Sequence, residues 1–312
     1  MTLRFSIIIP TLNRRQMLGE ALTSVRSQLW RDVEIIVVDG GSTDGTIEEL
    51  RSQSDIRLVE GPDRGLYDAL NKGIACADGE IIGLLNSDDL YSPGTFAAVA
   101  AAFRTGVHAV CGTALVIAED QVLATFDNAA DKALTSARTA LIGACTINAR
   151  FIRRDAMARI GPFTLDYTYV SDRDWLTRWH EAGLATATIN DVVLRYRQHA
   201  GSLTFDADRR RELPIREDLL RLARRWRDDP FAHPETRRIA ALLEGRCVAT
   251  LAVVALCKGN LAELGQRLFV DQGQRSIAPF VSIIRGGIDW VVQIPKRWKS
   301  SPTARASTAV ST

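Results

Sequence analysis

The first hundred residues alternate between continuously apolar runs and stretches with helical spacing, and this alternation constrains the fold more than any other feature. Strands are predicted by four apolar, β-branched runs, at residues 5–9, 33–38, 56–60 and 80–85. Helices are predicted by four stretches, at residues 14–29, 44–53, 64–77 and 93–103. Apolar strands separated by helices form parallel sheets that are buried on both faces. We therefore predict an α/β protein with a mainly parallel central sheet flanked by helices.

The rest of the chain divides near residue 205. Residues 107–126 have the pattern of shorter strands, and a helical stretch at 153–160 ends at Gly161-Pro162. Beyond Asp206 the pattern is helical and rich in arginine, with little strand signal. We predict one α/β domain over residues 1–205 and a helical, basic region over residues 206–312, with disorder in the last dozen residues.

Charge and cysteine content exclude several classes of protein. The net charge of +2 is too small to indicate nucleic-acid binding, and five scattered cysteines without a paired motif predict neither a zinc site nor a disulfide framework. No run reaches 18 apolar residues, and the first residues lack the apolar stretch of a signal peptide, so we expect a cytoplasmic protein.

The charge is unevenly distributed between the two regions. Residues 206–312 carry a net charge of +7 and residues 1–205 a net charge of −5. The basic region fits an anionic partner such as a membrane surface or a diphosphate, and it equally fits a solvated helical face. Within it, residues 283–298 combine Trp290 and Trp298 with basic side chains, which suits either a membrane interface or a dimer contact.

Polar clusters follow three of the predicted strands. Ligands bind beyond the carboxyl ends of strands in such sheets, so these clusters are where chemistry is expected. The candidate residues of the three clusters are Pro10, Thr11 and Asn13, then Asp39 and Ser42, then Asn86, Ser87 and Asp88.

Two of these clusters also have structural interpretations. Asp39 could bind a base or ribose, while the Gly-rich turn after it could simply lead to a helix capped by Asp44. Asp88 and Asp89 would repel each other at the end of a buried strand, and a bound Mg²⁺ or Mn²⁺ would relieve that repulsion. The alternative is an ordinary turn that contains aspartate.

Three further segments carry candidate residues. Arg64 could contact a phosphate or only solvent, and Asp68 shares a helix face with Lys72, with which it could pair. Asp172, beside aromatic residues, could act as a general base or could complement a helix dipole. His199 lies among arginines that would suit a diphosphate, although a lone histidine more often has no such role.

Taken together, these segments resemble the family-2 inverting glycosyltransferases of GT-A fold, in particular the branch of bacterial polysaccharide biosynthesis. The resemblance rests on SIIIPTLNR, EIIVVDGGSTDGT and PDRGLYDALNKGIACADGEIIGLLNSDDLY, which occur in the family's order and spacing over roughly residues 4–205. The ordered set is specific, although each segment alone is not.

The resemblance implies a role for several residues. Thr11 and Asp39 would hold the base and ribose of a nucleotide-sugar donor, UDP-sugar being the commonest. Asp88 would bind Mn²⁺ or Mg²⁺, with His199 as a second candidate ligand, and Asp172 would deprotonate the acceptor hydroxyl. The acceptor would be a glycan or a lipid-linked molecule, used at the inner face of the cell membrane.

Two positions depart from the family's pattern. Asn86 stands where the first aspartate of the DxD motif is usual, and Ser171 stands where glutamate is usual. These departures keep open an alternative, a non-catalytic protein that binds nucleotide sugars or glycans. A nucleotidyltransferase is disfavoured because PTLNRR, after the first strand, contains no glycine for a phosphate loop.

Overall fold

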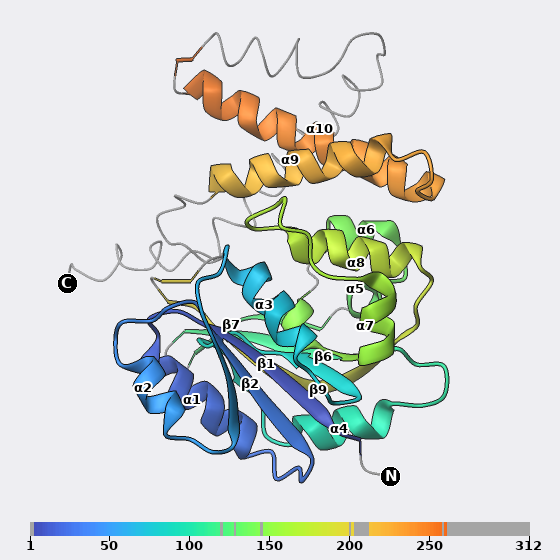
Figure 1. Ribbon diagram of the computed structural model, residues 1–312. Coiled ribbons are helices and arrows are strands. Elements are labelled where there is room, and N and C mark those ends of the chain that lie inside the picture. The colour runs from blue at the N-terminus through green and yellow to red at the C-terminus, as the bar shows by residue number, and fades with distance from the viewer. Residues whose placement is uncertain are drawn as a thin grey trace, which may run out of the picture. The chain divides into compact units, whose positions relative to one another are not determined.

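The computed structural model describes residues 3–118, 121–127, 129–143, 146–199, 201–202, 212–257 and 259–260. The chain divides into two compact units, Met1–Arg211 and Glu212–Thr312. The first unit contains one nine-stranded sheet with helices on both of its faces (Figure 1).

The strands follow one another along the sheet in the order β3-β2-β1-β4-β8-β6-β9-β5, and β7 pairs with β6. Their bounds are β1 Phe5–Thr11, β2 Val33–Asp39, β3 Ile56–Glu60, β4 Ile81–Leu84, β5 Leu90–Tyr91, β6 Ala109–Ala118, β7 Gln121–Phe126, β8 Arg150–Arg153 and β9 Thr186–Arg197. Strands β3, β2, β1 and β4 are mutually parallel, whereas β8 runs antiparallel to both β4 and β6. The carboxyl ends of β1, β2 and β4 therefore reach one edge of the sheet.

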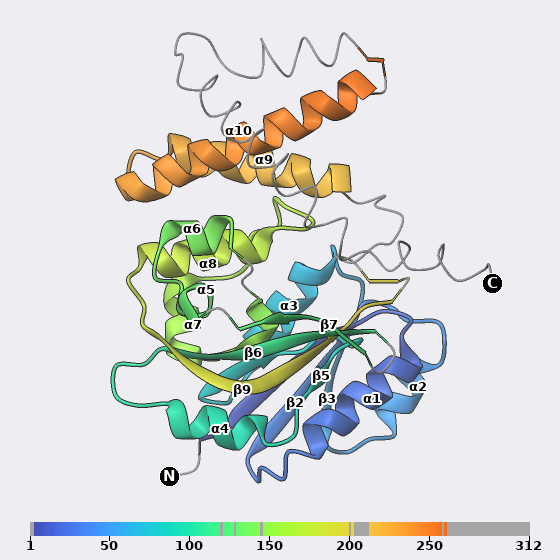
Figure 2. The ribbon, with the colours of Figure 1, turned by 180° about the vertical axis from the view of Figure 1, so that it is seen from behind.

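The helices cover the sheet on both sides, as Figures 1 and 2 show. One face carries α1 Arg15–Arg26, α2 Thr46–Arg51 and α4 Thr95–Ala102. The other carries α3 Leu66–Ala75, α5 Ala129–Ala133, α6 Ala137–Leu141, α7 Arg154–Ile160 and α8 Ser171–Glu181. A short 3₁₀ helix, η1 Ile147–Ala149, leads into β8.

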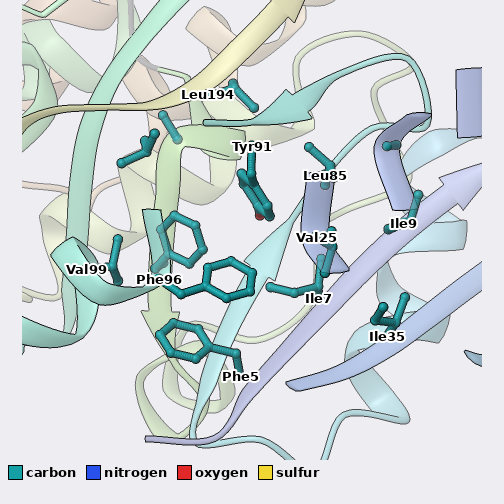
Figure 3. Close-up of a cluster of buried hydrophobic side chains, with 14 of the residues drawn as sticks. Phe5, Ile7, Ile9, Val25, Ile35, Leu85, Tyr91, Phe96, Val99 and Leu194 are labelled. Carbon is teal, nitrogen blue, oxygen red and sulfur yellow. The ribbon is translucent and has the colours of Figure 1, made fainter. Parts of the chain in front are cut away.

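Two apolar clusters fill the space between the sheet and its helices, because alternate residues of each buried strand face opposite sides. Phe5, Ile7 and Ile9 of β1 belong to the cluster drawn in Figure 3. There the rings of Phe5 and Phe96 stack with centroids 4.9 Å apart. Ile8 belongs to the second cluster, with residues of α3, α7 and α8. All seven residues of β1 are buried, which places this strand at the centre of the fold.

The predicted fold class is confirmed. Strands β1 to β4 fall within two residues of their predicted bounds, and the pairing becomes mixed only beyond β4. Helix α2 begins two residues later than expected because Gly45, in the left-handed region with φ of 86°, precedes it. Asp44 still accepts a hydrogen bond from the Thr46 N–H at 3.2 Å, so it contributes to the helix start without being the N-cap residue.

The second unit contains α9 Glu212–Asp228 and α10 Pro234–Cys257, which pack against each other. Arg224 and Arg227 of α9 both pair with Glu244 of α10. Among the described helices, none combines the length and apolar character needed to cross a bilayer. The segment 283–298, predicted to contact a membrane or a second copy, lies outside the described residues.

Close packing of α3 on the sheet gives a test of the fold. The Cβ of an alanine at position 73 would lie 2.4 Å from Ile8 Cγ2 and 3.1 Å from Val38 Cγ2. We expect Gly73→Ala to lower the free energy of unfolding by about 1–3 kcal/mol, measured by urea denaturation, because the helix must move away from β1 and β2.

The matched control is Gly19→Ala in α1, where no heavy atom lies within 4 Å of the added carbon. This change should raise the free energy of unfolding by about 0.5–1 kcal/mol, since alanine restricts the unfolded chain and favours helix. Equal effects of the two substitutions would contradict the packing described for α3.

Candidate functional site

The ends of β1 and β2 meet in register, with Thr11 opposite Asp39. The loops that leave these strands are tied to their neighbours by backbone hydrogen bonds. The Gly40 N–H donates to the Thr11 carbonyl at 3.1 Å, and the Gly61 N–H donates to the Asp39 carbonyl at 3.2 Å. Three successive strand ends are thereby held together before any ligand binds.

Two polar atoms in the corner where β1 and β2 end have no hydrogen-bond partner among the residues that the structure describes. Asp39 is fully buried, and its Oδ1 accepts bonds from the Gly41 and Ser42 N–H groups at 2.9 and 2.6 Å. Its Oδ2 is buried without a partner, as is Oγ1 of Thr11, which is 5% exposed. Leaving such groups unpaired costs about 1–3 kcal/mol each, so their persistence indicates a ligand that completes them.

The other candidates at this corner shape the loop. Asn13, in the left-handed region with φ of 51°, donates its N–H to Ser42 Oγ at 2.8 Å. Its side-chain oxygen accepts a bond from the Thr43 N–H at 2.8 Å, so the loops after β1 and β2 are interlocked. Pro10 is buried within β1. These residues hold the two loops in place by bonding to each other and, through the Ser42 N–H, to Asp39.

Arg64 and Asp68 differ in how far they are already engaged. Asp68 accepts a bond from the Arg64 N–H at 3.0 Å and pairs with Lys72 Nζ at 3.2 Å, as the structural interpretation expected. Both cations lower the pKa of this carboxyl, although the backbone bond from Arg64 has the larger effect. The Arg64 side chain is 75% exposed and lies 3.7 Å from Asp68, so it can reach an anion in solvent.

Asp88 meets two groups from distant parts of the chain. Its Oδ2 lies 3.0 Å from Nε2 of His199, and it also contacts Nη1 of Arg14. Arg14 follows β1, Asp88 follows β4 and His199 follows β9. The side chain of Asp88 is 15% exposed, so its charge is reachable from solvent and is balanced in this state by the Arg14 guanidinium.

Asp89 resolves the predicted repulsion in a different way. It is almost fully buried, and it accepts bonds from the Arg197 N–H at 3.0 Å and from Asn86 Nδ2 at 3.1 Å. Burial and, second to it, the neighbouring charge of Asp88 together raise the pKa of its carboxyl to about 7. Asn86 is thus engaged with Asp89, while Ser87 is buried beside it.

Asp88 and His199 offer one carboxylate oxygen and one imidazole nitrogen to a cation. The described residues contain no group of three or more acidic, histidine or cysteine side chains around one point, so further ligands would come from a bound diphosphate or water. That is how Mg²⁺ and Mn²⁺ are commonly held at phosphate sites. An imidazole ligand favours Mn²⁺ over Mg²⁺, because Mg²⁺ is bound mainly by oxygen.

Binding of a cation by His199 would require its proton to move. Nδ1 of the ring accepts a bond from the Gly201 N–H at 3.1 Å, so the proton of the neutral ring is on Nε2 and points to Asp88. A metal ion on Nε2 needs that nitrogen deprotonated. Asp88 and His199 fit the ion chemically. For His199 to bind it through Nε2, the ring proton moves to Nδ1 and the bond from the Gly201 N–H is given up.

Asp172 lies in the first turn of α8 and is held by Tyr67 at the start of α3. The Tyr67 hydroxyl donates to Asp172 Oδ1 at 3.1 Å, and the Arg173 N–H donates to the same oxygen at 2.9 Å. Burial raises the pKa of the Asp172 carboxyl above its ordinary value, while the Arg173 charge and the Tyr67 bond oppose that shift. No described residue donates a hydrogen bond to the second oxygen, Oδ2. A general base requires a carboxylate of raised pKa that is held in place through one oxygen and can accept a proton on the other.

The residues beside Asp172 have structural roles. Ser171 is fully buried, and its Oγ lies within hydrogen-bond distance of the Thr164 and Tyr167 carbonyls, at 2.7 and 3.0 Å. Asp174 is also fully buried and pairs with Arg178 at 2.9 Å. The serine therefore anchors the loop before α8 and presents no acid to the site.

Sequence reasoning missed Arg14 and Tyr67, and it considered Arg197 only as one of the arginines near His199 that would suit a diphosphate. Arg14 balances Asp88, Tyr67 holds Asp172, and Arg197 Nε contacts the Asp88 carbonyl. Arg14 directly follows the predicted first cluster and Tyr67 lies one residue from Asp68, so both were within the segments considered. Among the described residues, no direct hydrogen bond joins Asp172 or Tyr67 to Asp88, Arg14 or His199.

Comparison with known proteins finds similarity to glycosyltransferases in both sequence and fold. The profile of "Glycosyl transferase family 2" matches residues 6–165. A PGL/p-HBAD biosynthesis glycosyltransferase of Mycobacterium bovis is 32% identical over 236 residues, which cover 71% of this chain and 90% of that protein.

Two solved structures are similar in fold. The mannosyltransferase PcManGT of Pyrobaculum calidifontis, in complex with GDP-Man and Mn²⁺, superposes with a TM-score of 0.59 and 21% identity over 96% of this chain and 84% of that one. Residues 1–349 of S. aureus TarS, in complex with UDP-GlcNAc, superpose with a TM-score of 0.61 and 16% identity over 85% and 80% of the two chains.

The raised pKa of Asp172 predicts a stability effect that depends on pH. A carboxyl whose folded pKa exceeds its unfolded value contributes stability below the unfolded pKa, and this contribution is lost as pH rises through the folded pKa. We expect Asp172→Asn to raise the midpoint of thermal unfolding at pH 7, because ionisation of the partly buried wild-type carboxyl is less favourable in the folded than in the unfolded protein.

The difference should disappear below the ordinary carboxyl pKa of 3.8, where both proteins carry a neutral group at this position. Asp166→Asn, at an exposed position, serves as the control and should leave the midpoint almost unchanged at every pH. A lower midpoint for Asp172→Asn at pH 7 would show that the carboxylate is stabilising and would contradict this interpretation.

Proposed function

The chain belongs to glycosyl transferase family 2, and from that premise we propose that it transfers a sugar from a nucleoside-diphosphate-sugar donor to a hydroxyl group, with inversion at the anomeric carbon. The proposal rests above all on the unpartnered, buried Thr11 Oγ1 and Asp39 Oδ2, which lie on adjacent strands in register. A nucleoside supplies the donors and acceptors that would complete these atoms. UDP is our preferred nucleotide, with Thr11 and Asp39 as its base and ribose contacts.

The remaining donor contacts follow from the loops around this corner. Arg64 has an exposed guanidinium that suits a phosphate oxygen, and Asp68 orders the turn that precedes α3. Pro10, Asn13 and Ser42 would shape the walls around the nucleoside. Asn86 and Ser87 would line the way to Asp88, where the diphosphate is expected.

We assign Asp88 and His199 as the ligands of a divalent cation, with Mn²⁺ preferred over Mg²⁺ because of the imidazole. The cation, when bound, would neutralise the charge that develops on the leaving nucleoside diphosphate. Arg14 balances Asp88 in the structure described here and would be released from that ion pair, leaving its guanidinium available to a phosphate oxygen.

Asp172 would act as the general base. Its Oδ2 would accept the proton of the acceptor hydroxyl while the oxygen attacks the anomeric carbon from the face opposite the leaving diphosphate. One bond forms as the other breaks, so the configuration inverts. Tyr67 is a positioning residue, because its hydroxyl fixes Oδ1 and thereby directs Oδ2. The raised pKa of Asp172 strengthens it as a proton acceptor.

The acceptor would be a glycan or a lipid-linked molecule in surface polysaccharide biosynthesis. The similarity over 71% of the chain to a protein named as a PGL/p-HBAD biosynthesis glycosyltransferase supports a biosynthetic role. In this account residues 1–205 carry the reaction, and residues 206–312 provide a basic region that meets either a membrane surface or a second copy.

The test of this proposal is the Asp172→Asn variant, assayed with sugar donor and acceptor and separately for donor binding. We expect the transfer rate to fall by about 100- to 10,000-fold, the usual contribution of a general base. The dissociation constant of the nucleotide should stay within a factor of about two, because the carboxylate faces the acceptor side. Weakened nucleotide binding would instead assign Asp172 to the donor site.

Tyr67→Phe provides a second readout that a merely structural role would not produce. Loss of the hydroxyl removes a bond that lowers the pKa of Asp172, so the acid limb of the kcat/KM profile should move to higher pH. Asn71→Asp would not serve as a control. The Asn71 side chain donates to the Phe163 carbonyl and accepts from the Phe163 N–H, so the change would disturb the fold. An unmoved limb in Tyr67→Phe would contradict the base assignment.

A further inference from the structure

A cavity of about 120 Å³ lies among β6, β7, α5 and the segment that leads into β8, and the proposed reaction does not use it. Its lining combines backbone and side-chain polar groups with two basic residues. The residues that matter to its chemistry are Lys132, Arg150, Asp127, Asp131 and Thr146. The volume is comparable with that of engineered cavities that bind small molecules of a few heavy atoms.

Lys132 of α5 is a buried cation with which no carboxylate of the described residues pairs. It is 6% exposed, and its Nζ donates to Thr113 Oγ1 at 3.1 Å and to the Ile189 carbonyl at 3.2 Å. Both acceptors are neutral. A buried ammonium ion is normally paired with an acid, because neutral acceptors compensate only part of its lost hydration.

Arg150 of β8 is buried more completely and is satisfied less well. It is 1% exposed, and among the described residues its Nη2 donates to the Lys132 carbonyl at 2.6 Å and its Nη1 to Thr186 Oγ1 at 3.4 Å. Its Nε is buried without a partner. A guanidinium has five N–H donors and is always charged, so most of its capacity is unused among the described residues.

The two carboxylates of the lining do not compensate these cations. Neither forms an ion pair with Lys132 or Arg150 among the described residues, whose bonds are all to neutral oxygens. Asp127 is exposed. Asp131 lies beside Gly143, because a Cβ built on that glycine would be 2.7 Å from Asp131 Oδ1. The cavity therefore has two buried positive charges in its wall with which no described carboxylate forms an ion pair.

We propose that this cavity binds one small oxyanion, the carboxylate or phosphate group of a ligand, between Lys132 and Arg150. An oxyanion would compensate both charges and could accept the unused guanidinium N–H bonds in pairs. Thr146 adds a hydroxyl group to the lining. The volume and the two wall carboxylates limit the site to a single small anionic group.

The oxyanion could come from free phosphate or from an acidic sugar, and the latter source rests on the proposed function. The cavity wall is connected to the proposed base through a short route. Asp131 lies beside Gly143, and the Gly143 carbonyl accepts a bond from Arg173 Nη1 at 3.0 Å, one residue after Asp172. An acidic sugar held in the cavity would therefore lie on the α8 side of the sheet.

The test uses the full chain at constant ionic strength, with thermal unfolding measured against inorganic phosphate, D-glucuronate and, as an uncharged control, D-glucose. We expect a saturable rise in the unfolding midpoint with at least one of the anions and none with glucose, since a ligand that binds only the folded state stabilises it by mass action. A response to phosphate alone assigns a phosphate source, and a response to glucuronate assigns an acidic sugar.

Lys132→Met and Arg150→Met should each weaken that response at least tenfold, while Arg104→Met, at an exposed position, should leave it unchanged. If Arg150→Met fails to fold, Lys132→Met decides alone. The effect of UDP on the midpoint should persist in Lys132→Met, which separates this site from the donor site. No response to either anion, or an equal response in Lys132→Met, would overturn the proposal.

Discussion

The parallel pairing of β1 with β2 on one side and β4 on the other is the constraint on which the rest of the site depends. Because β1 is buried along its whole length, its apolar side chains hold the register on both faces. That register places Thr11 opposite Asp39 and brings the loop after β4 to the same edge. A slip of one residue would turn every side chain of β1 to the other face and separate these strand ends.

The polar groups at this edge are maintained at a cost in stability. Asp39 and Thr11 keep unpartnered oxygens in a buried corner, and Asp172 keeps a partly buried carboxylate whose pKa is raised. Asp88 is balanced by Arg14, which a ligand could replace, whereas Asp89 is fully engaged and serves the fold. Polar groups that lack a hydrogen-bond or charge partner within the protein are the ones that a substrate can pair with. This distinction separates binding residues from structural residues within the same short motif.

The fold class and the location of the site could be predicted from the sequence because both depend on local patterns, namely apolar runs and the polar residues after them. The side chains that contact the site residues could not be predicted in this way. Arg14 reaches Asp88 across 74 positions and Tyr67 reaches Asp172 across 105, and no local pattern encodes such pairs. Ser171 and Asn86, which appeared as departures from a catalytic pattern, have their own structural partners, and Lys132 and Arg150 drew no attention because nothing in the sequence marks them as buried.

The most direct measurement is thermal unfolding with UDP, GDP, dTDP and CDP, each with and without Mn²⁺, in the wild type, Asp39→Asn and Thr11→Val. Asparagine retains the oxygen that accepts the Gly41 and Ser42 bonds, and valine keeps the shape of threonine, so both variants should fold. The account predicts that one nucleotide raises the wild-type midpoint, more strongly with Mn²⁺, and that both variants lose most of this shift. No shift with any nucleotide, or an undiminished shift in both variants, would contradict it.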